Sequence, residues 1–172
     1  LPTALVVYRE RGVLRRMSTP PVRPGTLLAA QLVIYFAVSV VSVALILVLG
    51  NAVLGVPYPR ALGAFAGSYL LGALTLFALG LWLAAVAPNS RVVQGAGSAA
   101  MFPLLFFAGM WLPRRLMPEV LRRISDLPPT GALGQLFTDA FAGHPPEAFH
   151  LAVAAGWAVA AGLAAARMFR WE

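Results

Sequence analysis

Four long apolar stretches limit what this chain can fold into more than any other feature of its sequence. The first two, residues 27–50 and 61–87, contain no charged residue. The third spans residues 92–112 with Pro103 inside it, and the fourth and shortest spans residues 149–166. A helix rises about 1.5 Å per residue and a hydrocarbon core is about 30 Å thick. We therefore expect each stretch to cross a membrane as a helix.

The composition supports this expectation. Hydrophobic residues make up 60% of the chain and charged residues 11%, against about 25% charged in a typical soluble domain. The formal net charge is +7, but the arginines punctuate the apolar runs instead of forming one basic face, which argues against a nucleic-acid partner. The chain has no cysteine, which excludes disulfides, zinc–thiolate sites and thiol catalysis. The sequence predicts an all-α membrane protein, with residues 1–172 forming a single transmembrane domain.

The first eight residues have the composition of part of a further membrane span. Residues 1–8 are apolar and run directly into Arg9, whereas a signal peptide places its positive residues before its apolar ones. We expect this stretch to be the end of a truncated span, with an ordinary frayed terminus as the alternative.

The placement of arginine predicts the orientation of the spans, because cytoplasmic loops carry more positive residues. Eight arginines fall on one side of the predicted membrane and five on the other. The larger group comprises Arg9, Arg11, Arg15, Arg16, Arg23, Arg91, Arg167 and Arg170, and the smaller one Arg60, Arg114, Arg115, Arg122 and Arg123. We therefore expect both ends of the chain to be cytoplasmic and the loop at residues 113–148 to be external.

Residues 9–25 form the most charged segment. Val13, Leu14 and Met17 fall on one face of a helix, with most arginines elsewhere. Prolines then prevent this helix from continuing into the first span; they are Pro20, Pro21 and Pro24. We predict a short amphipathic cytoplasmic helix followed by a stiff link. The helix could serve as an anchor that touches anionic lipid head groups or as a docking helix for a cytoplasmic partner.

The sequence of the external loop predicts two short helices, and neither is long enough to cross the membrane. The first has Pro118 near its start, and its apolar residues recur at helical spacing, namely Met117, Val120, Leu121, Ile124 and Leu127. The second has Thr130 as a cap and Gly143 as its end, with an apolar face of Leu133, Leu136, Phe137, Ala140 and Phe141. We also expect an i,i+4 ion pair between Arg122 and Asp126. Both helices suit a position in the interface or a re-entrant one, and an ordinary extracellular cap is the alternative.

Several function classes are disfavoured. No charged residue lies inside a predicted span, which argues against an ion-coupled carrier and an intramembrane hydrolase. The phosphate-binding pattern G-x-x-x-x-G-K-[ST] is missing from the sequence, so we expect no enzyme activity and no cofactor in this chain. His144 and His150 have no convincing partners at metal-ligand spacing, so we interpret them as loop and interface residues.

Two segments carry a resemblance to a known family. The string R-E-R-G-V-L-R-R-M-S-T-P-P-V-R-P at residues 9–24, soon followed by L-L-A-A-Q-L, resembles the segment between the second and third spans of ABC type-2 transporter permeases. It is most similar to the daunorubicin-resistance kind of drug exporter and departs from the pattern in its second proline, Pro21. The string F-A-G-M-W-L-P-R-R-L-M-P-E-V-L-R-R-I-S-D-L-P-P at residues 107–129 is similar to the segment after the family's fifth span.

The resemblance implies that this chain corresponds to the last two-thirds of a six-span permease, without the first span and most of the second. It implies a coupling helix that sits in a groove of an ATP-hydrolysing subunit, formed by Arg9, Glu10, Arg11, Gly12, Val13, Leu14, Arg15, Arg16 and Met17. It also implies external helices that close the outer end of the path, with Met117, Leu121, Ile124, Leu133, Leu136 and Phe137 as their residues.

The function implied by the resemblance is ATP-driven export of a hydrophobic or amphipathic substrate across a bacterial plasma (inner) membrane. The expected partners are a cytoplasmic ABC ATPase subunit that holds ATP and magnesium, a second permease copy and membrane lipid. The alternative is a membrane scaffold or assembly protein without a transport cycle.

Overall fold

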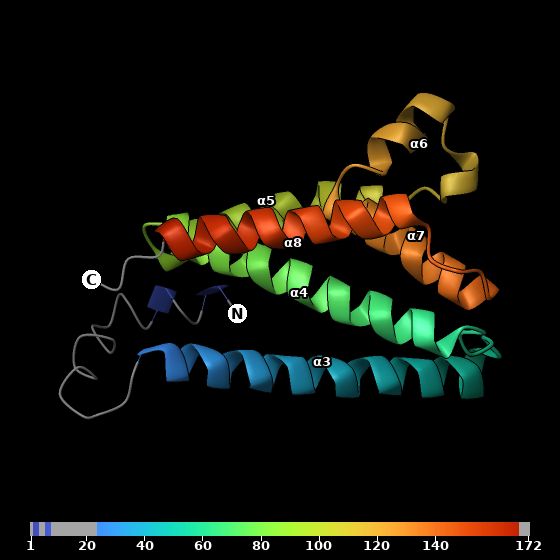
Figure 1. The fold of residues 1–172 in the computed structure, drawn as a ribbon, viewed down its shortest axis with the longest axis horizontal. Helices are drawn as coiled ribbons and strands as arrows, with labels where there is room; N and C mark the ends of the chain where they lie inside the picture. Colours follow the sequence, from blue (N-terminus) through green and yellow to red (C-terminus); the bar gives the residue numbers. More distant parts are fainter. Residues whose placement is uncertain (1, 4–5, 8–23, 169–172) are drawn as a thin grey trace.

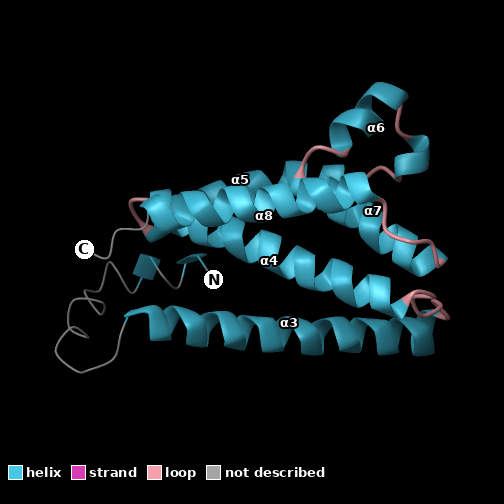
Figure 2. Ribbon diagram, in the orientation of Figure 1, coloured by secondary structure: helices cyan, strands magenta, loops and turns pink. Residues whose placement is uncertain are grey.

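Long helices dominate the structure, a computed structural model that describes residues 2–3, 6–7 and 24–168. The described part of the chain contains helices and loops and no strand (Figure 2). Three of its helices are long and apolar enough to cross a membrane: α3 (Pro24–Leu54), α4 (Leu62–Val86) and α8 (Ala148–Met168). The all-α prediction is confirmed, and three of the four predicted spans are helices of sufficient length and hydropathy.

The first long helix, α3, begins and ends outside the predicted range of 27–50. It starts at Pro24, which the sequence assigns to the stiff link; the structure places this proline in the first turn of α3, and its role as a stiff link stays a prediction. Proline is favoured in the first turn of a helix, because the backbone N–H that it lacks would have no partner there. The helix ends at Leu54, and the following Gly55 has a φ of +66°, a left-handed conformation that suits glycine. At 31 residues, α3 is the longest helix of the described chain.

Helices α4 and α8 pack against each other along the bundle (Figure 1). A small residue permits the close approach, since Ala154 of α8 is fully buried and packs with Leu71 of α4. Gly72 of α4 instead leaves room for the Leu133 side chain of α7. At the same level the Thr75 hydroxyl donates to the carbonyl oxygens of Leu71 and Ala154, at 2.7 and 3.1 Å. The observed bounds differ from the predicted 61–87 and 149–166 by at most two residues.

Helix α3 lies beside α4 but makes little contact with it (Figure 1). None of the side chains in its apolar window is buried. Its contacts with α4 include a 2.5 Å hydrogen bond between the hydroxyls of Ser39 and Tyr69 and a ring contact between Phe36 and Tyr69. Most of the apolar surface of α3 is therefore available to lipid or to other membrane helices.

Helix α5 (Ser90–Phe107) is shorter than the predicted span at residues 92–112. The side chain of Asn89 caps its start by accepting from the Val92 N–H at 2.9 Å. The helix ends at Phe107 because Gly109 adopts a φ of +83°, so the last five predicted residues form a turn. Its 18 residues extend about 27 Å. It is not among the helices long and apolar enough to span, so the fourth span stays a prediction.

Three short helices follow α5, namely the 3-10 turn η1 (Arg114–Leu116), α6 (Glu119–Ser125) and α7 (Pro129–Ala142). Gly143 ends α7 with a φ of +85°, as predicted. The predicted cap at Thr130 is wrong, because Pro128 precedes the helix and the Thr130 hydroxyl instead donates to the Leu104 carbonyl oxygen of α5. Helix α7 packs into the bundle, whereas α6 projects from its end (Figure 1).

Of the predicted truncated span at residues 1–8, the structure describes only residues 2–3 and 6–7, which are helical. Val6 is buried in a cluster with Ala84, Ala87 and Val93, where α4 ends and α5 begins. This junction of α4 and α5, against which Val6 packs, is at the end of the bundle opposite α6 (Figure 1).

Candidate functional site

The predicted ATPase-coupling segment, Arg9–Met17, lies outside the described residues, as do Pro20 and Pro21 of the link. Pro24 is described, and it belongs to α3. The coupling role of these residues stays a prediction, and the candidate site available for description lies at the other end of the bundle, around α6 and α7.

The predicted gate residues of α7 form one packed group. Leu133 and Leu136 are buried together with Ala154 of α8, and Phe137 packs against this cluster. The Phe137 ring also lies 5.4 Å from that of Phe65 on α4. Helix α7 is thus an integral part of the bundle and not a loosely attached flap.

The gate residues on the α6 side are more varied. Met117 is buried just before α6, Leu121 is half-buried, and Ile124 is 47% exposed. Val120 on the same helix is 71% exposed. The sequence grouped the residues of both helices as one gate, whereas the structure separates a packed α7 from a peripheral α6.

Two glycines allow α7 to approach its neighbours closely. A Cβ atom at Gly131 would lie 1.6 Å from the carbonyl oxygen of Ser125, at the end of α6. One at Gly134 would lie 3.1 Å from the carbonyl oxygen of Ala108, at the end of α5. The junction of α5, α6 and α7 therefore depends on the lack of a side chain at these two positions.

An ion pair joins the two ends of the segment 114–126, which contains η1 and α6 and is called the α6 region below. The Arg114 guanidinium donates to both carboxylate oxygens of Asp126, from Nη1 to Oδ1 and from Nη2 to Oδ2, the latter at 2.7 Å. Nη1 also donates to the Ser125 hydroxyl. This arrangement is bidentate and therefore stronger than a single contact. The predicted pair between Arg122 and Asp126 is wrong; on α6 the i,i+4 pair is Arg123 with Glu119.

His150 completes this cluster from α8. Its ring is only 5% exposed, and Nε2 lies 3.2 Å from Oδ1 of Asp126. Nδ1 lies 3.1 Å from Oε2 of Glu147 but is not aligned for a hydrogen bond. The sequence indicates an interface residue at position 150, and the structure places His150 between two carboxylates. No group of three side chains among the described residues is suited to hold a metal ion.

The environment of Asp126 shifts its pKa. Burial alone would raise the pKa of this carboxyl, but the hydrogen bonds and charges of Arg114 and His150 outweigh it and hold the pKa below its ordinary value of 3.8. Asp126 is therefore charged at neutral pH and can attract both cationic partners.

One further polar contact joins the loop after α6 to α8. The indole N–H of Trp157 donates to the Leu127 carbonyl oxygen at 2.8 Å. Together with the Asp126–His150 contact, this bond fixes the C-terminal end of α6 to the first half of α8. Because α6 has an exposed apolar side, these directional bonds define its position more than apolar burial does.

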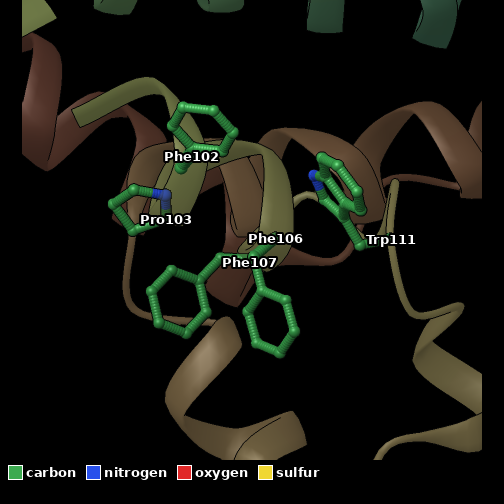
Figure 3. A pocket seen from close by; sticks show the side chains of 5 residues that line it. All are labelled: Phe102, Pro103, Phe106, Phe107 and Trp111. Atoms are coloured by element: carbon green, nitrogen blue, oxygen red, sulfur yellow. The ribbon is translucent and has the colours of Figure 1, made fainter. Parts of the chain in front are cut away.

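An apolar groove of about 370 Å³ lies on α5 and the turn after it (Figure 3). Aromatic rings and one proline line it: Phe102, Pro103, Phe106, Phe107 and Trp111. The Trp111 side chain is 66% exposed, and tryptophan favours the boundary between hydrocarbon and head groups. The groove suits apolar groups such as lipid chains.

The hydroxyls inside the spans mostly bond to backbone. Ser39 donates to Phe36 and Ser42 to Val38, each through a carbonyl oxygen. Ser68 of α4 is buried, and its hydroxyl has no partner in the described part of the chain. The sequence alone does not decide whether polar side chains in the spans line a substrate path or bond to backbone. The bonds of Ser39, Ser42 and Thr75 to carbonyl oxygens of their own helices favour the second role.

Comparison with known proteins gives a family match over most of the chain. The family model described as ABC-2 type transporter matches residues 1–141, which is more than half of the 172 residues. No solved structure matches the chain at a significant level.

Two curated relatives were found, both described as "Probable multidrug ABC transporter permease YbhS", from Escherichia coli strain K12 and from Escherichia coli O157:H7. Each is 27% identical over 130 residues, which cover 74% of this chain and 34% of the relative. The matched part of the chain thus spans about a third of the length of these relatives.

Proposed function

The chain belongs to the ABC-2 type transporter family, and on this premise we propose that it is the permease part of an ATP-driven exporter of hydrophobic or amphipathic molecules. The family match over residues 1–141 is the observation that carries the proposal. The three apolar helices α3, α4 and α8 support it, because they can form a multi-pass membrane domain. The curated relatives, whose printed name includes "multidrug", favour a substrate of this class.

In the proposed cycle, a cytoplasmic ABC ATPase subunit binds the segment Arg9–Met17 and hydrolyses ATP with magnesium. Closure of two such subunits moves the segment and with it the start of α3. Two permease copies surround the substrate path in a bacterial plasma membrane, with both ends of this chain in the cytoplasm. Dimerisation, direction and location are parts of the proposal.

A continuous series of contacts could transmit this motion to the far end. Helix α3 is unbroken from Pro24 to Leu54 and only loosely attached to α4. The loop after it leads to Ala61, whose N–H donates to the Ala140 carbonyl oxygen of α7 at 3.0 Å. Gly131 of α7 in turn lies against the end of α6. A shift of α3 could therefore displace α7 and α6 without passing through the α4–α8 contact.

The proposal is tested by changing the apolar face of the predicted coupling helix. We expect the combined substitutions Val13→Asp, Leu14→Asp and Met17→Asp to reduce co-purification of the ATPase subunit at least tenfold, about 1.4 kcal/mol of binding free energy, because each places a charge in an apolar contact. Stimulation of ATP hydrolysis by the permease should fall in parallel. Both are measured on the detergent-solubilised complex.

A matched triple variant controls for the added acidic charge. Val56→Asp, Leu116→Asp and Val120→Asp change exposed residues that are not part of the predicted coupling segment, with exposed fractions of 44%, 66% and 71%. This variant should retain the ATPase subunit. Unchanged binding and stimulation in the coupling variant would contradict the proposal, and a protein that never binds an ATPase would instead fit the membrane scaffold.

A further inference from the structure

The apolar groove on α5 follows one side of that helix. Its helical residues recur at spacings of three and four, which places them on one side; they are Phe102, Pro103, Phe106 and Phe107. The rings of Phe106 and Phe107 pack edge to face, with their centroids 5.6 Å apart. Phe102 and Trp111 are each 66% exposed, so the groove is open to its surroundings (Figure 3).

A second cavity, of about 340 Å³, lies next to the groove, between the end of α5 and the middle of α7. Phe107 lines the groove and Ala108 lines this cavity, and the Cα atoms of consecutive residues are only about 3.8 Å apart. Unlike the groove, the cavity has polar side chains in its lining, namely Arg114, Arg115, Gln135 and Thr138. An apolar and a polar site therefore adjoin at the end of α5.

Arg115 carries the charge of this cavity that no carboxylate neutralises in the described part of the chain. Arg114 is paired with Asp126, whereas Arg115 is exposed and forms no ion pair with a described residue. The side-chain amide of Gln135 has no hydrogen-bond partner among the described residues either. The Thr138 hydroxyl donates to a carbonyl oxygen of its own helix, so it can only accept from a further group. The cavity thus offers donors to an anion and an acceptor to a hydroxyl.

The order of these features matches the structure of a phospholipid. The groove takes apolar groups, and Trp111 at its end is a residue that favours the boundary between hydrocarbon and head groups. The unpaired cation Arg115 follows beyond this tryptophan. A phospholipid has its acyl chains, its glycerol and its phosphate in the same order, and an anionic one complements the charge of the cavity.

We propose that the groove and the cavity together bind one anionic phospholipid, with an acyl chain against the aromatic rings and the phosphate at Arg115 and Gln135. The acyl chain gains little when it moves from the bilayer into the groove, since both are apolar. The preference for an anionic head group therefore comes from Arg115. One arginine near an anionic lipid is expected to raise affinity about fivefold, that is, by about 1 kcal/mol. This inference does not rest on the proposed exporter.

The test uses the fluorescence of Trp111 in the full chain, reconstituted into phosphatidylcholine nanodiscs. Lipids with brominated acyl chains quench a tryptophan that they contact, and they are supplied either as phosphatidylglycerol or as phosphatidylcholine. The chain has four tryptophans, so the Trp111 signal is the part that Trp111→Phe removes, measured in every background. We expect brominated phosphatidylglycerol to quench this signal at about one-fifth of the mole fraction that brominated phosphatidylcholine requires.

Variants of Arg115 show whether this preference arises in the cavity. Arg115→Gln should abolish it, and Arg115→Lys, which keeps the charge, should retain most of it. Arg122→Gln is the matched control, because Arg122 is also exposed and without an ion pair among the described residues but does not line the cavity. A parent without the preference, a preference that survives in Arg115→Gln, or one that is lost in Arg122→Gln would overturn the proposal.

Two further outcomes separate a phospholipid from other occupants. Glycerol phosphate in solution should not reduce the quenching, because it lacks the acyl chain; displacement by it would reveal a phosphate site that needs no lipid. If neither lipid quenches Trp111, the groove is covered by protein, such as a second copy of the chain. Either result would contradict the proposal. The nanodiscs contain no ATPase subunit, so failure of the lipid site and failure of the exporter proposal are distinguishable.

Discussion

Gly131→Ala is expected to destabilise the protein by about 3 kcal/mol or to prevent its folding, because the new methyl group would lie 1.6 Å from the carbonyl oxygen of Ser125. The carbonyl carbon of Ser125 would be only 2.8 Å away, so the obstacle is backbone and cannot rotate aside. Overpacking of a close contact typically costs about 1–3 kcal/mol and occasionally more. The measurement is thermal unfolding of the detergent-solubilised protein.

Two further glycines give a graded control series. At Gly134 the added Cβ would be 3.1 Å from the Ala108 oxygen, so a small shift suffices and an intermediate effect is expected. At Gly156 of α8 nothing lies within 4 Å, so Gly156→Ala should be neutral or slightly stabilising, since alanine favours a helix by about 1 kcal/mol over glycine. Equal stability of the Gly131 and Gly156 variants would contradict the close junction of α6 and α7.

Asp126→Asn is expected to release α6 from the bundle. The substitution leaves Arg114 and His150 without their shared carboxylate, and loss of one partner of a buried pair costs about 3–5 kcal/mol. The side chains of Arg114 and Asp126 are 24% and 16% exposed, so we expect about 2–3 kcal/mol. Amide hydrogen exchange of residues 114–127 should accelerate roughly 30- to 150-fold, while exchange in α4 and α8 stays unchanged.

The exposed pair of α6 provides the control for Asp126. Glu119→Gln removes the contact with Arg123, in which the side chains are 64% and 78% exposed. Such surface pairs contribute little, so exchange in this variant should match the parent. Equal acceleration in the two variants, or none in either, would show that the Asp126 cluster does not position α6.

The pH dependence of this docking follows from the direction of the Asp126 shift. Its pKa is lower in the folded protein than the ordinary 3.8, so the carboxylate's contribution is fully present above pH 3.8 and is lost as the pH falls through the folded pKa. Docking of α6 should therefore weaken only as the pH falls below 3.8, measured as faster amide hydrogen exchange of residues 114–127 after correction for the intrinsic exchange rate.

The long helices could be predicted from the sequence because their signal is local. An uncharged apolar run of sufficient length defines a span by itself, and the bounds of α4 and α8 were predicted within two residues. The start of α3 at Pro24 was missed because proline prevents continuation of a preceding helix but also suits the first turn of a new one. The early end of α5 depends on Gly109, which spacing alone does not reveal.

The polar cluster could not be predicted because its members are far apart in the chain. Sequence spacing favoured Arg122 as the partner of Asp126, four residues away, whereas the structure pairs Asp126 with Arg114 and His150, at separations of 12 and 24 residues. The Arg114 contact requires the turn between η1 and α6, and the His150 contact requires α7 to return the chain to α8. A titratable residue at the end of a predicted span is the sequence signal that could have drawn attention to His150.

The most direct test of the central claim is site-specific crosslinking from the predicted coupling helix. A photoreactive amino acid in place of Leu14 should capture, in intact cells, a protein whose peptides include the ATP-binding pattern G-x-x-x-x-G-K-[ST]. The same group in place of Val120, an exposed residue of α6, should not capture it. Identification of that ATPase at Leu14 alone is the predicted result, and its absence from the Leu14 products, or equal capture from both positions, would contradict the account.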